Sequence, residues 1–213
     1  MSPAFKLRLG IAVGLCCLVA DASGQQRINR RSERSGAQGR ESRVIQQTSG
    51  ITSDGQSGQS VDHQFAACLL QANLGEVKLA KIAADRAESK DVKDFAEHMI
   101  KDHSAVAEKL ERLVGNQEPT DRRSQVEKQI NERCMAMLQE ELESKSGREF
   151  DACYVGSQVG GHMHMVAALE VLADQSSGQL QQIVKDAQPT VEKHYKMAQA
   201  LMKQIEERKA SDN

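Results

Sequence analysis

From Asp62 to Lys209 apolar residues recur at intervals of three and four positions, which is the spacing of one face of an α-helix. Ala, Leu, Glu, Gln, Lys and Met, all good helix formers, dominate this part of the chain. Breaks in the pattern divide it into helices at about 62–87, 90–114, 125–143, 147–174 and 178–209. The sequence therefore predicts an all-α fold.

Short polar motifs mark the starts of the predicted helices. Ser89 is a candidate N-cap for the helix that follows it. Three further pairs have the spacing of capping boxes and are expected to open the last three helices: Ser124/Glu127, Ser146/Glu149 and Ser176/Gln179. Pro189 lies inside the last helix, where a proline is expected to produce a kink.

The lengths of the connections predict how the helices are arranged. Tight turns join the first helix to the second and the fourth to the fifth, which makes each pair an antiparallel hairpin. The third helix spans roughly 30 Å at about 1.5 Å per residue, enough to carry the chain from one end of a bundle to the other. Its buried stripe is expected to be Val126, Ile130, Cys134, Met137 and Leu138. Two antiparallel hairpins joined by a crossover helix form a ferritin-like four-helix bundle.

Each of the four long helices carries an ionisable residue in the middle of its apolar stripe when residues are placed at 100° per step. These residues are Glu76, His103, His162 and His194. At about 1.5 Å per residue, the first three lie at similar heights, roughly 18 to 22 Å from one end of the bundle, and His194 lies about one turn away. One carboxylate and three imidazoles are therefore expected in one layer of the core.

Buried ionisable groups need partners, because burying an unpaired charge is costly. One carboxylate and three histidines suit a single transition-metal ion such as zinc, copper or iron. The alternative is a metal-free hydrogen-bond network in which Glu76 pairs with a protonated histidine, the more usual way of satisfying buried polar groups. A rotation of the helices that exposes some of these residues is a third interpretation. The sequence leaves all three open.

The run His162-Met163-His164-Met165 combines two side chains that favour copper. Successive residues of a helix point about 100° apart, so these four cannot all bind one ion. We therefore expect His164 at the surface. His63 and His98 are also expected to face solvent.

The sequence lacks the patterns of several enzyme classes. Ferritin-like di-iron enzymes use Glu-x-x-His pairs, but the residues three positions before the inward histidines are Ile100, Val159 and Val191. No serine, cysteine or paired-carboxylate arrangement suggests a hydrolase. The leading interpretation is a non-enzymatic protein with a buried polar or metal-binding layer. A mononuclear metalloenzyme or redox protein and a metal-free structural or interaction bundle are the alternatives.

The first 22 residues have the features of a secretion signal. Lys6 and Arg8 precede an apolar run over residues 9–20, and Ala20-Asp21-Ala22 has the small-x-small pattern that signal peptidase reads. The run has about 12 residues where a membrane span needs about 20, so no transmembrane segment is expected in the mature chain. Leu15 before Cys16 argues against lipidation. The predicted location is the periplasm or cell envelope.

The other segments are a basic linker at 23–60, the bundle at 61–209 and a short tail at 210–213. The linker is rich in Gln, Arg, Ser and Gly, a composition typical of disorder. The formal net charge of −2 predicts no nucleic-acid partner. Removal of the signal leaves Cys68, Cys134 and Cys153, an odd number whose disulfide pairing stays open.

Several short motifs resemble a known family in their order and spacing. They are Glu76-Val77 with residues 79–83 (LAKIA), residues 92–96 (VKDFA), Met99, Asp102-His103, Gly147, Phe150-Asp151, Tyr154, Val159 before His162, and Pro189 before His194. Over about residues 64–201 the chain resembles an exported domain-of-unknown-function family, often labelled "predicted outer membrane protein" and placed among ferritin-like proteins. The resemblance implies an exported ferritin-like bundle and places the family's glutamate and histidine positions on Glu76, His103, His162 and His194. Gly160-Gly161 and the three cysteines depart from the family pattern, and the glycines are expected to bend the helix beside His162.

Overall fold

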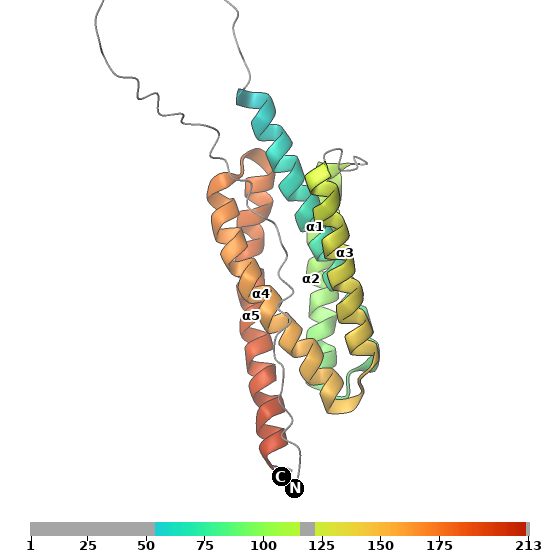
Figure 1. The fold of residues 1–213 in the computed structure, drawn as a ribbon. Helices are drawn as coiled ribbons and strands as arrows, with labels where there is room; N and C mark the ends of the chain where they lie inside the picture. The colour runs from blue at the N-terminus through green and yellow to red at the C-terminus, as the bar shows by residue number, and fades with distance from the viewer. Residues whose placement is uncertain (1–53, 116–121, 212–213) are drawn as a thin grey trace, which may run out of the picture.

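The structure, a computed structural model, describes residues 54–115 and 122–211, and it consists of helices joined by short connections. The helices are α1 (Asp54–Arg86), α2 (Lys90–Val114), α3 (Arg122–Glu143), α4 (Gly147–Gln175) and α5 (Gly178–Ser211) (Figure 1). The prediction of an all-α fold is confirmed. The predicted signal segment and nearly all of the predicted linker lie outside the described residues.

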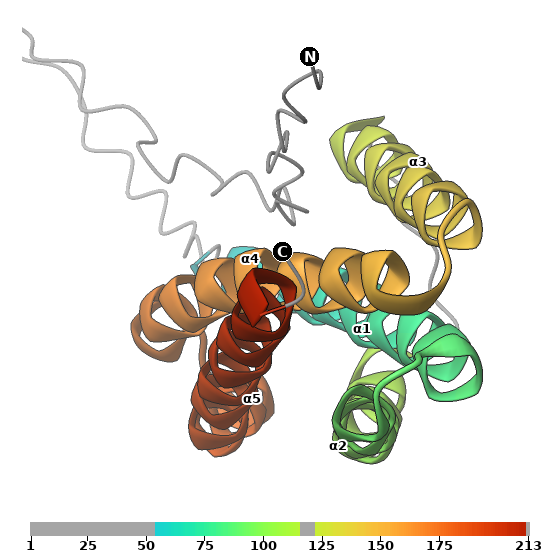
Figure 2. The ribbon, with the colours of Figure 1, turned by 90° about the horizontal axis from the view of Figure 1, so that it is seen from below.

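Two long hairpins build the body of the molecule. α1 packs mainly on α2 and α4 mainly on α5, and the hairpins meet through α2 against α5 and α1 against α4. α3 packs mainly on α1 and α4, and it lies at the edge of the group formed by the other helices (Figure 2). The interior is therefore enclosed mainly by α1, α2, α4 and α5. None of the described helices combines the length and apolar character needed to span a bilayer.

An aspartate from the opposite hairpin holds each hairpin turn. At one end, the carboxylate of Asp151 in α4 accepts the backbone N–H groups of Glu88 and Ser89 at 3.0 and 2.8 Å. At the other end, Asp62 in α1 accepts the backbone N–H and the hydroxyl of Ser177 at 3.1 and 2.6 Å. These contacts set the height of one hairpin against the other.

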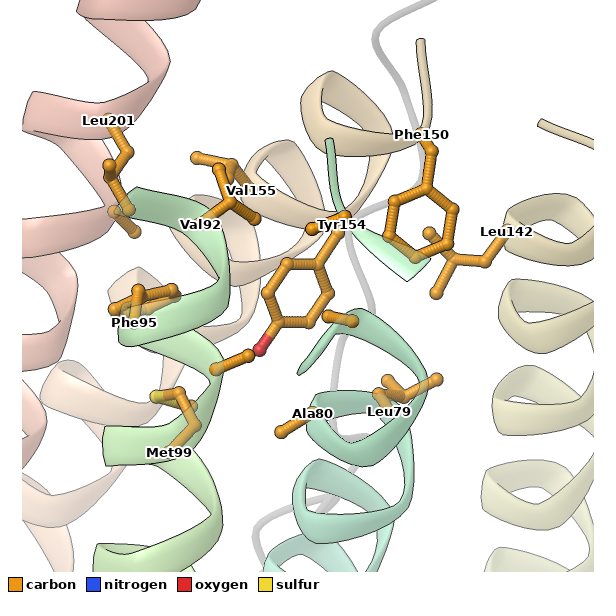
Figure 3. Close-up of a cluster of buried hydrophobic side chains, with 14 of the residues drawn as sticks. Leu79, Ala80, Val92, Phe95, Met99, Leu142, Phe150, Tyr154, Val155 and Leu201 are labelled. Atoms are coloured by element: carbon orange, nitrogen blue, oxygen red, sulfur yellow. The ribbon is translucent and has the colours of Figure 1, made fainter. Parts of the chain in front are cut away.

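The buried apolar residues form two clusters, one toward each end. The first cluster lies near the α1–α2 turn, and Figure 3 shows the ring of Tyr154 among its members. It comprises Leu79, Ala80, Ala83, Ala87, Val92, Phe95, Ala96, Met99, Leu138, Leu142, Phe150, Tyr154, Val155, Ala198, Leu201 and Ile205. The second cluster comprises Ala66, Leu69, Leu70, Ala107, Leu110, Val114, Leu169, Leu172, Ala173, Leu180, Ile183, Val184, Ala187 and Val191. Between them each long helix carries one of the inward polar residues expected from the sequence.

The structure corrects two of the predicted helix starts. α1 begins at Asp54, eight residues before the predicted Asp62, because a helix already nucleated by an apolar stripe extends through polar residues at little cost. α3 begins at Arg122, so the backbone of Ser124 lies inside the helix and not at its cap. α2 begins and ends where the sequence predicts, and Gly115 ends it with a positive φ of 63°.

The serines of the predicted capping boxes do not cap the N-termini of α4 and α5. Ser146 stands directly before α4, but its side chain makes no capping hydrogen bond, and neither does that of Ser89 before α2. Ser176 belongs to the end of α4, where its hydroxyl donates to the carbonyl oxygen of Leu172. Ser177 is the residue before α5. α5 continues across Pro189 as one helix, and the expected kink stays a prediction.

The predicted buried stripe of α3 is largely wrong. Val126, Ile130 and Met137 are 45–47% exposed, whereas Leu138 is buried in the first cluster. A helix at the edge of the molecule has a narrow buried side, so only part of an apolar stripe can be covered. Cys68, Cys134 and Cys153 are half-buried and form no disulfide in the described part of the chain.

Candidate metal centre

Three histidines from three helices converge between the two apolar clusters. His103, His162 and His194 are 8%, 2% and 1% exposed. The ring of His103 lies 5.6 Å from that of His162 and 5.3 Å from that of His194, and the last two are 5.4 Å apart, measured between centroids. One ring nitrogen of each histidine lies within 4.8 Å of the other two. The three imidazoles therefore share one layer, as the sequence predicts.

The environment of His103 fixes which of its nitrogens carries the proton. The side-chain amide of buried Asn73 donates through Nδ2 to the carbonyl oxygen of Leu69 at 2.7 Å, which leaves its Oδ1 facing His103. Nδ1 of His103 lies 2.8 Å from that oxygen. Because an amide oxygen only accepts hydrogen bonds, Nδ1 is the donor. Nε2 of the neutral ring consequently carries the lone pair.

The other two histidines are fixed in the same way. His162 donates through Nδ1 to the backbone carbonyl of Gln158, one turn earlier in α4, at 3.1 Å. His194 donates through Nε2 to the carboxylate Oδ2 of Asp102 on α2 at 3.0 Å. In each neutral ring the opposite nitrogen keeps its lone pair. Each histidine is thus oriented by an acceptor outside the cluster, the arrangement typical of metal-ligating histidines.

Electrostatics favour neutral rings at all three positions. Burial lowers the pKa of His162 to about 4. Burial, together with the neighbouring His162 and His194, holds the pKa of His103 well below its usual value. Burial also lowers the pKa of His194, against the opposing effect of Asp102. A neutral imidazole is the form that binds a metal ion, so proton removal would cost little near neutral pH.

The lone-pair nitrogens have no hydrogen-bond partner within the described protein. His103 Nε2, His162 Nε2 and His194 Nδ1 are all shielded from solvent and unpaired, as is Oε2 of Glu76. Buried polar atoms normally have partners. Three clustered histidines with unpaired nitrogen atoms form a group that could hold a metal ion.

Glu76 lies beside the histidine cluster and not within it. It lines the same cavity as the three histidines, but no carboxylate oxygen of Glu76 belongs to the group of mutually close ligand atoms. The side chain of Gln158 forms a hydrogen bond with the Glu76 carboxylate. Burial raises the pKa of Glu76, against the opposing effects of that bond and of His194. The predicted pairing of Glu76 with a protonated histidine stays a prediction.

The residues that orient the histidines were not identified as site residues from the sequence. Asn73 lies one turn before Glu76 in α1, and Asp102 is the neighbour of His103, turned sideways toward α5. Asn73 is 9% exposed. In the sequence, the position of Asn73 one turn before the inward Glu76 could have indicated that Asn73 belongs to the site. Asp102 carried no such signal, because adjacency in a helix implies a different face.

The remaining histidines lie away from this layer. His98 and His164 are exposed, as predicted. The prediction that His63 faces solvent is wrong, because His63 is half-buried and its Nε2 lies 3.0 Å from the carbonyl oxygen of Val114. Of the His162–Met165 run, Met163 is 56% exposed while Met165 lines the cavity. Because Met163 faces solvent and Met165 lines the cavity, the four side chains of the run do not form a single site.

Comparison with known proteins places the chain in a family. The model of a domain of unknown function, DUF4142, matches residues 47–201. The chain belongs to the DUF4142 family. No curated protein and no solved structure matches it. The matched range contains all three histidines together with Asn73, Glu76 and Asp102, so the candidate metal centre lies inside the DUF4142 domain.

Proposed function

We propose that this protein binds one first-row transition-metal ion in its core. His103 Nε2, His162 Nε2 and His194 Nδ1 are the proposed ligands, and Glu76 stands beside them as a partner of a fourth, exogenous ligand. The observation that carries the proposal is that each ring donates its N–H to a separate acceptor and leaves a buried, unpaired nitrogen.

The spacing of the histidines is compatible with a common ion. Imidazole nitrogens bind zinc at about 2.0–2.1 Å, which in a tetrahedral centre separates neighbouring nitrogens by about 3.4 Å. One nitrogen of each ring lies within 4.8 Å of one nitrogen of the other two, so the side chains would have to move closer to reach this spacing around one ion. A set of neutral imidazoles suits zinc, copper or iron, and a site with a single nearby carboxylate is a poor match for calcium or magnesium.

Titration of metal-free protein tests the proposal. Chelator-treated protein is titrated with zinc, copper and iron(II) in separate experiments, and binding is followed by calorimetry and elemental analysis. One equivalent of at least one ion is expected to bind. An ion present at 100 times its dissociation constant should stabilise the fold by about 2.7 kcal/mol, seen as a higher Tm.

A matched pair of α2 variants makes the test specific. His103→Ala removes a proposed ligand, whereas His98→Ala removes an exposed histidine from the same helix. We expect the first to lose tight binding and the second to bind as the unaltered protein does. Equal binding by both variants, or a Tm that no metal raises, would count against the metal site and favour a metal-free core.

We further propose that the chain is exported and that its bundle is ferritin-like. The first 22 residues support export by their sequence pattern, and the two hairpins with α3 along one side support the bundle arrangement. N-terminal sequencing of protein from the periplasmic fraction is expected to find a chain that begins after Ala22. Full-length protein retained in the cytoplasm would contradict export. An experimental structure compared with ferritin-like bundles would test the fold.

A further inference from the structure

A cavity of about 80 Å³ lies directly against the three histidines. Glu76, Asn73 and Asp102 line it together with the histidines at one end. Toward the other end its wall is apolar and includes Leu69, Leu110, Leu169, Ile183, Val184 and Ala187. The space therefore has a polar end at the proposed ligands and an apolar body.

The cavity extends mainly to one side of the histidine layer. All the buried apolar residues that line it belong to the second cluster, whereas the first cluster contributes only half-buried Met135, which packs against it. On the first cluster's side, the ring of Phe95 packs edge-on against His194, with centroids 6.4 Å apart. From His103 to Leu110 the cavity follows seven residues of α2, or roughly 10 Å. The open space therefore lies mainly on the side of the second cluster.

Three protein ligands leave a metal ion with an open position, which is the pattern of metal sites that bind exogenous molecules. Glu76 is not among the mutually close ligand atoms, and the cavity is the space into which that position can open. Structural metal sites are instead closed by a fourth protein ligand.

The cavity also limits the kind of molecule that fits. An apolar cavity of about 150 Å³ accommodates benzene, so a space of half that size takes only a few heavy atoms. Burying a further charge against apolar walls is costly. Asp102 and Glu76 already bring carboxylates to the polar end, so a divalent ion does not require an anionic ligand for balance.

We infer that this cavity binds a small uncharged diatomic molecule, and this inference rests on the proposed metal site. One atom of the molecule coordinates the metal ion, and the molecule lies against the cavity wall formed by the second cluster. Nitric oxide is a suitable probe, because its complex with iron(II) gives a distinct electron paramagnetic resonance signal. The full-length protein is loaded anaerobically with iron(II) and titrated with nitric oxide, and azide, a linear triatomic ion, serves as a small anionic probe.

Two variants on α5 separate the cavity from the metal site. Ala187→Leu fills the cavity without touching a proposed ligand, and Ala200→Leu makes the same change at an exposed position of the same helix. We expect both to bind iron with unchanged stoichiometry. Ala187→Leu should weaken nitric oxide binding by about tenfold or more, because the larger side chain occupies the space that the diatomic molecule needs. Ala200→Leu should bind nitric oxide as the unaltered protein does.

Each outcome supports or overturns the inference. Val184→Ile adds one methylene at the cavity wall and is expected to weaken nitric oxide binding less. This variant replaces Ala187→Leu in the test if Ala187→Leu does not fold. Iron-loaded protein that binds no nitric oxide, binds azide more tightly, or is insensitive to both cavity variants overturns the inference and leaves the metal site standing. Failure to load iron(II) also overturns it, and zinc titration of the same sample then decides whether the proposed function fails with it.

Discussion

The carboxylate of Asp102 in α2 accepts the Nε2–H of His194 in α5 across 3.0 Å, although the two residues are 92 positions apart in the chain. His194 is 1% exposed, while the side chain of Asp102 is 33% exposed. The contact joins the two hairpins at the height of the proposed metal site. It also aims the free Nδ1 of His194 by fixing the orientation of the ring.

Replacing Asp102 should weaken metal binding without removing a ligand. Loss of a carboxylate that orients a ligating histidine typically lowers metal affinity by about 10- to 100-fold, and we expect this for Asp102→Ala. Asp102→Asn should recover part of the loss, because its amide oxygen can still accept the Nε2–H. Competition with a chelator measures the affinities, and Asp94→Ala, at an exposed position of the same helix, is the control. Equal affinity for Asp102→Ala and the control would refute this role.

The metal-free protein should lose stability as the pH falls from about 6.5 to 4. The pKa of His162 is about 4 in the folded protein, whereas an unfolded histidine titrates near 6.5. Between these values the unfolded chain binds a proton that folded His162 does not, so the free energy of unfolding falls as the pH is lowered. His162 alone accounts for about 3 kcal/mol, and the lowered pKa values of His103 and His194 act in the same direction.

Glu76 acts in the opposite direction over part of this range. Its raised pKa means that the folded protein takes up a proton before the unfolded chain does, so this carboxyl favours folding as the pH falls through its folded pKa. Denaturant unfolding of metal-free protein at several pH values measures the sum of these effects. His162→Leu should show a shallower dependence. A flat profile for the unaltered protein between pH 6.5 and 4 would contradict the assignment of neutral buried histidines.

Asp151 should matter for stability and not for metal binding. Its carboxylate is 3% exposed and accepts two backbone N–H groups of the α1–α2 turn. Asp151→Ala leaves those donors without their acceptor, which should cost about 1–3 kcal/mol in denaturant unfolding. Asp174→Ala, at an exposed position near the end of α4, should change little. Unchanged metal stoichiometry is expected for both, and a specific loss of metal from folded Asp151→Ala would show that the turn does more than join the helices.

Tyr154→Phe should leave the fold as stable as before or make it more stable. The ring of Tyr154 is fully buried in the first cluster, and its hydroxyl has no hydrogen-bond partner within the described protein (Figure 3). Removing an unpaired buried hydroxyl removes a desolvation cost while keeping the packing of the ring. Thermal unfolding measures the effect, with Tyr195→Phe at a half-buried position as the comparison. A loss of more than about 1 kcal/mol would mean that the hydroxyl has a partner in solution.

Local patterns in the sequence are enough to predict the helices and their inward faces. The apolar periodicity that places His103, His162 and His194 on buried stripes depends only on the geometry of a single helix. The bounds of α2 follow the breaks beside Ser89 and Gly115 in the same way. The same kind of reasoning fails for the α3 stripe, because the exposure of Val126 and Ile130 depends on what packs against that helix.

The sequence by itself determined that four helices each carry an inward polar residue, because the α-helical period fixes which side chains share a face. Only the tertiary structure decided which nitrogen of each ring has a hydrogen-bond partner and which is left unpaired. Asn73 on α1 orients His103 of α2, and Asp102 on α2 orients His194 of α5. Contacts between helices depend on how the helices are turned and set in height against one another, and no periodicity within a single helix contains that information. For the same reason, Glu76 could be placed in the layer from the sequence, but its position beside the histidine group could not.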